Sequence, residues 1–105
     1  PADGYSAEVS TDGLAGTVRA NWLGFGPDRA FAHIYSDHQG DKADRAELRL
    51  EQNGVSESFT RDFWPAEFVL PIDATVPALL TLTVIDRDGQ RHSAPSLTIA
   101  PPYTK

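Results

Sequence analysis

The most concentrated group of potential metal ligands is a short acidic segment in the middle of the chain. Asp37, Asp41 and Asp44 fall within eight residues, and calcium takes several carboxylate and carbonyl oxygens from a compact loop. However, Lys42 and Arg45 interrupt the run, and no Glu closes the loop at the spacing of an EF-hand. We therefore interpret the segment as a solvated turn and expect no cofactor. Structural calcium held by these three aspartates is the alternative.

The histidines and serines do not form a motif that indicates catalysis. His33, His38 and His92 show neither the HxH nor the HExxH spacing of a metal site. Ser93 directly follows His92, and neighbouring residues on a strand point to opposite faces of the sheet. Since this spacing argues against a Ser-His dyad, the sequence predicts that the chain is not an enzyme.

Aromatic residues are the best candidates for a binding surface. The segment Phe63-Trp64-Pro65 lies between two predicted strands and is flanked by Arg61 and acidic residues. An exposed Trp beside carboxylates suits the stacking of a sugar ring, whereas a buried Trp would cap the hydrophobic core. We favour the core cap for Trp64. We retain Trp64, Phe63, Phe25 and Arg61 as candidate residues for ligand or partner binding.

Length and charge restrict the class of protein and of partner. The chain has 105 residues and a formal net charge of −6, with no cysteine. This length predicts one domain, which we place at residues 1–100, followed by a tail at 101–105. An acidic surface repels phosphate backbones, so nucleic acid is not an expected partner. No apolar run approaches the length of a membrane span, so membrane insertion is not expected either.

Alternation of apolar and polar residues is the dominant pattern of the chain, and it indicates strands. Turn residues separate the alternating runs, which are 5–10, 14–22, 31–36, 46–52, 55–60, 67–72, 79–86 and 90–99. In the third run both faces carry apolar or aromatic residues, which indicates partial burial of both. Seven or eight short strands of this kind predict an all-β fold, an antiparallel β-sandwich. Trp22 ends the second run on its apolar side and is expected in the core.

Two turn signals predict hairpins. Asn53-Gly54 and Asp88-Gly89 each suit a type I′ turn, which requires positive φ at both central residues. Each turn joins the two runs that flank it, so residues 79–99 are predicted to form a hairpin. The segment 42–52 has a composition that favours helix. Because charges alternate with its leucines, we predict a strand there, with a helix as the alternative.

The last hairpin carries a resemblance to a known kind of module. Residues 82–95 comprise an alternating apolar strand, an Asp-Gly turn and a polar strand that ends in Ser-Ala-Pro. This segment resembles the last two strands of bacterial immunoglobulin-like and fibronectin-III-like modules, whereas residues 24–40 depart from the fibronectin pattern. The resemblance implies an immunoglobulin-like or fibronectin-III-like sandwich. It also implies an accessory role in a secreted or periplasmic protein.

A second resemblance concerns residues 31–37, Phe-Ala-His-Ile-Tyr-Ser-Asp. They are similar to a strand in the small C-terminal β domains of bacterial phospholipases C, although other aromatic and glycine signatures of those domains are missing.

Together these patterns predict a non-catalytic immunoglobulin-like module that makes protein contacts or spaces domains in a larger secreted or periplasmic protein. The chain begins at Pro1 and contains no Met, which indicates a processed product or a piece cut from a longer chain. The expected partner is another protein or the remainder of a larger chain. A carbohydrate-binding module that stacks sugars on exposed aromatics is the alternative.

Overall fold

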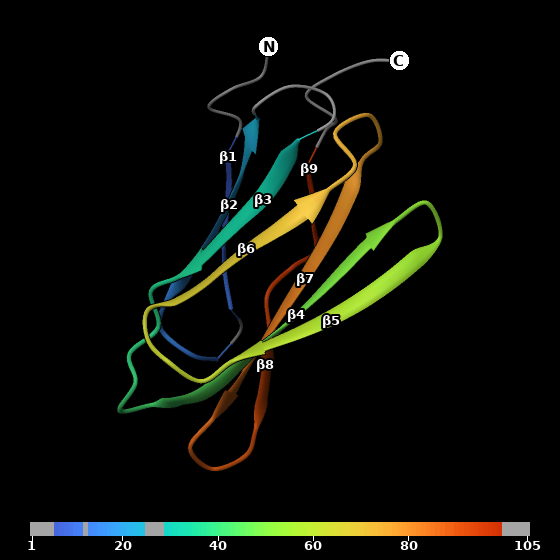
Figure 1. The fold of residues 1–105 in the computed structure, drawn as a ribbon. Coiled ribbons are helices and arrows are strands. Elements are labelled where there is room, and N and C mark those ends of the chain that lie inside the picture. The colour runs from blue at the N-terminus through green and yellow to red at the C-terminus, as the bar shows by residue number, and fades with distance from the viewer. Residues whose placement is uncertain (1–5, 12, 25–28, 100–105) are drawn as a thin grey trace.

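The chain forms two antiparallel sheets that pack face to face as a β-sandwich (Figure 1). A computed structural model describes residues 6–11, 13–24 and 29–99. The strands are β1 (Ser6–Ser10), β2 (Thr17–Gly24), β3 (Ala30–Ser36), β4 (Ala43–Gln52), β5 (Val55–Arg61), β6 (Ala66–Ile72), β7 (Ala78–Asp86), β8 (Arg91–Ser93) and β9 (Leu97–Ile99). Sheet A has the order β1-β2-β3-β6. Sheet B has the order β5-β4-β7-β8, with β9 also paired to β7.

The all-β prediction is confirmed. These ranges contain no helix, and hence none that could cross a membrane. The segment for which a helix was the alternative forms β4, a ten-residue strand. β4 occupies one edge of β7, so β8 and β9 must both pair with the other edge. They are two parts of one interrupted strand, which gives eight strand positions in the sandwich.

The hairpin at Asn53-Gly54 is confirmed in its position and in its turn type. Asn53 has φ +53° and Gly54 has φ +75°. Positive φ at both central residues is the defining feature of a type I′ turn. The turn closes on the pair Gln52 and Val55, and it sets the register of β4 against β5 along its whole length.

The hairpin at Asp88-Gly89 is also present, but the predicted turn type is wrong. Only Gly89 has positive φ, at +85°. The loop is closed by Gly89 N–H donating to the Asp86 carbonyl at 3.0 Å and by Asp86 N–H donating to the Gln90 carbonyl at 2.9 Å. The Asp86 carboxylate also accepts the N–H groups of Asp88 and Gln90, both at 2.9 Å. These bonds favour a three-residue loop, in which a left-handed glycine follows a type I turn.

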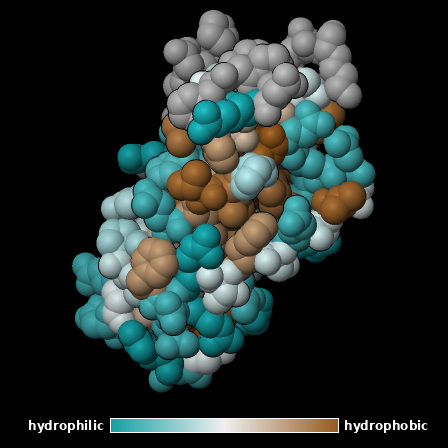
Figure 2. Space-filling model, viewed as in Figure 1, coloured by the Kyte–Doolittle hydropathy of each residue, from teal (hydrophilic) through white to brown (hydrophobic). Residues whose placement is uncertain are grey.

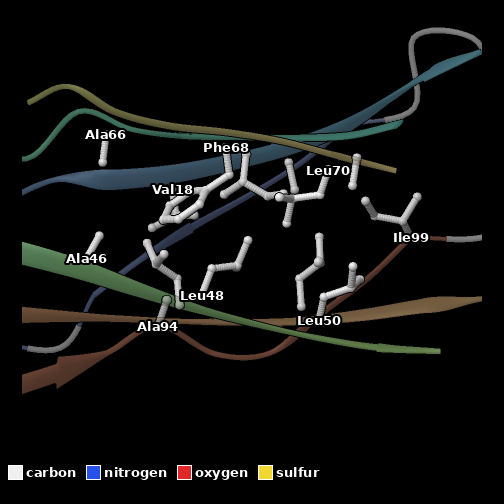
Figure 3. Packing of buried hydrophobic residues seen from close by; sticks show 14 of the residues in the cluster. Val18, Ala46, Leu48, Leu50, Ala66, Phe68, Leu70, Ala94 and Ile99 are labelled. Atoms are coloured by element: carbon white, nitrogen blue, oxygen red, sulfur yellow. The ribbon is translucent and has the colours of Figure 1, made fainter. Parts of the chain in front are cut away.

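The facing sides of the two sheets interleave in one hydrophobic core (Figure 3). Phe68, Ile34 and Leu48 are among its largest fully buried side chains. The residues between them along each strand point outward, as the alternation of the sequence predicts. Trp22 is 4 % exposed, which confirms its predicted place in the core.

Candidate functional site

The aromatic loop that was the leading binding candidate connects β5 to β6. Phe63 is 52 % exposed, whereas Trp64 is half-buried and packs against the core. The Trp64 ring centre lies 6.0 Å from that of His38. Its Nε1 is buried without a hydrogen-bond partner among the residues described. Trp64 therefore offers little surface to a ligand. Phe25 lies outside the described residues.

Arg61 joins the two sheets on the side of the sandwich where β5 lies beside β6. Its Nη1 donates to the Thr60 carbonyl at 2.9 Å and its Nε donates to the Glu67 carbonyl at 3.2 Å. The guanidinium also lies over the Phe68 ring, 4.7 Å from its centre. These contacts engage the guanidinium within the fold rather than toward a ligand.

The acidic segment does not converge on a metal. Asp37 accepts the Thr17 N–H at 2.6 Å and the Thr17 hydroxyl at 3.1 Å. The backbone hydrogen bond is the main reason that the pKa of Asp37 is lowered. Asp44 pairs with Arg45 and Arg87. In the part of the chain that the structure describes, no group of three or more His, Cys, Asp and Glu side chains could hold an ion.

His38 is the centre of a buried polar network at one end of the sandwich. Thr11 Oγ1 donates to the Leu14 carbonyl at 2.8 Å, so it accepts from His38 Nε2 at 2.7 Å. Nδ1 then accepts the hydroxyl of Ser36 at 2.5 Å. Burial lowers the pKa of His38 and favours this neutral ring. Ser36 is fully buried, so it cannot act as a nucleophile on a substrate.

His92 and Ser93 have different partners. His92 Nε2 lies 2.8 Å from the carboxylate of Asp86, and this contact is the main reason that the pKa of Asp86 is lowered. Ser93 Oγ lies 3.2 Å from Thr83 Oγ1. The pair Asp86–His92 links the two strands of the last hairpin. Its two members are six residues apart in the sequence, and no sequence motif relates them.

The outer face of sheet A is the surface best suited to binding. Its residues lie in three rows across β2, β3 and β6, which are Leu23–Phe31–Pro71, Asn21–His33–Val69 and Arg19–Tyr35–Glu67. The first row is apolar, and Val69 extends it into the second. Leu23 is 38 % exposed and Val69 is 49 % exposed. β3 contributes a column of three aromatic rings, all half-buried.

The other end of this face is polar, and its side chains contact one another through hydrogen bonds. His33 lies between Asn21 and Glu67, with Nδ1 3.0 Å from Asn21 Oδ1 and Nε2 2.7 Å from Glu67 Oε2. With Arg19 and Tyr35 these side chains line a shallow depression of about 450 Å³. The face thus passes from apolar to polar, as the centre and rim of a protein interface do.

The outer face of sheet B has a different chemistry. It carries hydroxyl and charged side chains that bond to one another, in the pairs Thr81–Ser96, Thr83–Ser93, Arg49–Ser56 and Arg91–Glu47. The hydrogen bond from Arg91 is the main reason that the pKa of Glu47 is lowered. Because these described groups are paired among themselves, we take the outer face of sheet A as the candidate binding surface.

The sequence held one signal for this surface. Phe31, His33 and Tyr35 alternate with Ala32, Ile34 and Ser36, and the predicted partial burial of both faces is confirmed. In fact the small and aliphatic set faces the core, and the aromatic set faces outward. Alternation alone could not decide which set was internal.

Comparison of the chain with protein-family models, with curated proteins and with solved structures found no match. The function is therefore inferred from the surfaces described above.

Proposed function

We propose that this chain is a non-catalytic β-sandwich module that docks against a protein partner or a neighbouring domain. The observation that carries the proposal is the contrast between the two outer faces. Sheet A presents aromatic and aliphatic side chains with a polar margin, whereas sheet B presents hydroxyls and charges already paired. Exposed apolar patches with polar rims are typical of protein interaction sites.

The strand order supports an immunoglobulin-like or fibronectin-III-like assignment. In such sandwiches strands A, B and E share one sheet, and strands C, F and G share the other. If β2 is taken as strand A, then β2-β3-β6 matches A, B and E, and β4-β7-β8 matches C, F and G. β5 is then the additional strand beside C, and β1 extends the first sheet. With this assignment we also expect the chain to belong to a secreted or periplasmic parent protein.

The buried position of Ser36 and His38 supports a non-catalytic role. Their network at the end of the core satisfies polar groups instead of exposing them. The polar margin of sheet A holds a His and a Glu that contact each other, and among the described residues that line its depression the only hydroxyl belongs to Tyr35 rather than to a Ser or Thr.

A site-specific photocrosslinking experiment tests the proposed docking surface. Benzoylphenylalanine replaces Leu23 or Val69 on sheet A, or the control residues Thr81 or Thr83 on the outer face of sheet B, in the full-length protein. We expect both sheet A positions to give the same adduct, with one protein or with one neighbouring segment. Equal adducts from both sheets, or none from sheet A, would refute the proposal.

Carbohydrate binding is a second candidate, and the polar row of sheet A favours it. Tyr35 stands between Arg19 and Glu67 in the cross-strand register, so opposite charges flank an aromatic ring. This arrangement suits a neutral polyol better than an ion. Under this hypothesis Tyr35→Ala lowers retention on immobilised neutral polysaccharides and Val69→Lys does not. If the face docks a protein instead, Val69→Lys lowers binding and Tyr35→Ala does not.

A further inference from the structure

The sandwich protects two of its free strand edges but leaves part of a third open. On β6, Arg61 occupies the Glu67 carbonyl, and Pro71 has no N–H to offer. The edge formed by β8 and β9 is interrupted at residues 94–96, which include Pro95. Proline and interruption are common ways to block strand addition at a sheet edge. β5 has neither over its first five residues.

The register shows which backbone groups β5 presents. The two-residue turn makes Gln52 and Val55 a hydrogen-bonded pair, and such pairs alternate along an antiparallel ladder. The N–H and C=O groups of Ser56, Ser58 and Thr60 therefore point away from β4. Arg61 occupies the carbonyl of Thr60, which agrees with this assignment. Ser56 and Ser58 are left with complete donor and acceptor pairs at the open edge.

A groove lies beside this edge. It has a volume of about 200 Å³ and lies between the hairpin and β6, where Leu50, Val55, Glu57 and Pro71 line it. The turn end of the hairpin stands away from β6 (Figure 1). In the same view Figure 2 shows hydrophobic surface between β6 and the hairpin. The side of β5 that faces the core is thus uncovered next to its open edge.

The charge at the centre of this groove identifies the kind of occupant. Glu57 is paired with Leu50 in the β4–β5 register, so its side chain points to the inner face. It is exposed, and no hydrogen bond or ion pair engages it in the described structure. In a strand added to β5, the residue opposite Glu57 would also point inward. Its inward neighbours would lie opposite Val55 and Phe59.

We propose that the first half of β5 is a strand-addition site for an extended partner segment. The segment has a Lys or Arg opposite Glu57 and an apolar residue two positions away on each side. The main-chain pairs of Ser56 and Ser58 bind its backbone, and Val55 and Phe59 contact the apolar side chains. This mode of recognition takes affinity from the backbone and selectivity from alternate side chains.

A second copy of this chain that pairs through its own Ser56 and Ser58 offers no Lys or Arg opposite Glu57. When two β5 strands pair antiparallel with Ser56 opposite Ser58, Glu57 stands directly opposite its own copy. Like charges directly opposite one another destabilise a strand pair. In this register the same carboxylate that attracts a basic segment opposes self-pairing.

A peptide titration tests the site. The probe is the acetylated and amidated peptide Thr-Val-Thr-Lys-Thr-Val-Thr, and the control peptide has Glu in place of Lys. We expect the Lys peptide to shift the amide NMR signals of Ser56 and Ser58 and to slow their hydrogen exchange. Glu57→Gln should weaken its binding about threefold, within the range of an exposed ion pair. Glu57→Lys should reverse the preference between the two peptides.

Glu51→Lys provides the matched control, because it makes the same change of charge on the outer face of β4, where Glu51 pairs with Arg49. We expect it to keep the preference for the Lys peptide. Equal binding of both peptides, shifts confined to another surface, or no binding would each overturn the proposal. Self-association of the chain through β5, measured by analytical ultracentrifugation with exchange protection at Ser56, would overturn it as well.

Discussion

The guanidinium of Arg61 lies over the ring of Phe68, 4.7 Å from its centre, and covers the core on the side where β5 lies beside β6. Phe68 is fully buried although it lies on β6, an edge strand. The same guanidinium bonds a carbonyl of β5 and a carbonyl of β6. One side chain thus links the two sheets where no backbone ladder does.

We expect Arg61→Ala to lower the free energy of unfolding by about 1–2 kcal/mol. The variant loses a cation–π contact and two hydrogen bonds from a charged donor, on a half-exposed side chain. The control Arg49→Ala removes an arginine from the outer face of sheet B, where an exposed ion pair contributes about 1 kcal/mol or less. Urea unfolding measures both. If the two variants lose equal stability, Arg61 does not link the sheets.

The features that could be predicted from the sequence are those that depend on local patterns of residues. Alternation places each residue on one side of a strand, and Asn53-Gly54 has the backbone freedom that its turn requires. The turn at Gly89 was mispredicted because the Asp86 carboxylate bonds to two backbone amides of the loop. A prediction made from the two residue types of the turn does not take that contact into account.

The candidate site was less accessible to sequence analysis because its contacts are tertiary. Arg61, retained as a binding residue, makes its contacts with β6, and Trp64 packs beside His38 from a distant part of the chain. The rows on sheet A depend on the register of three strands, and β6 follows β3 only after an intervening hairpin. Alternation along one strand carries no information about that register.

The stability of the protein should depend on the protonation of His38. Burial lowers the pKa of its ring from 6.5, against the opposing effect of Asp37 and with a further lowering by His92. The unfolded chain then binds this proton more readily than the folded chain does. The contribution is fully present above pH 6.5 and is lost as pH falls below that value.

Urea unfolding over the range from about pH 7.5 to about pH 5 measures this dependence, since it spans the ordinary pKa of histidine. His38→Phe keeps a ring in the cavity and removes the titration, so its stability should change less over the same range. Asp37 and Asp86 also have lowered pKa values, but their contributions are lost as pH falls below 3.8. An equal slope in both proteins would contradict the assignment.

Two glycines should respond to alanine for different reasons. Gly54 has φ +75° and open space around it, so Gly54→Ala costs only conformational strain, about 1 kcal/mol. A Cβ on Gly24 would lie 1.9 Å from Cζ3 of Trp22. Gly24→Ala must displace that buried ring, which costs about 2–3 kcal/mol, as overpacking does. Thermal unfolding of both variants should rank Gly24→Ala as the more destabilised, and the reverse order would exclude the clash.

Trp64 should act through packing rather than through ligand contact. Trp64→Ala removes a half-buried ring from beside His38 and the core, and we expect a loss of about 2–4 kcal/mol. Trp64→Phe keeps an aromatic ring and also removes the buried N–H that has no described partner. Its stability should therefore stay within about 1 kcal/mol of the wild type, because an unpaired buried donor carries a cost of its own.

The comparison with Phe63→Ala completes this test, since Phe63 is next in the chain and 52 % exposed. Phe63→Ala should leave the unfolding free energy within about 0.5 kcal/mol of the wild type, as surface substitutions usually do. Crosslinking from Leu23 and Val69 should survive Trp64→Phe, because the ring does not belong to the outer face of sheet A. If Trp64→Phe abolished those adducts while the fold stayed intact, the loop between β5 and β6 would have to be part of the docking surface.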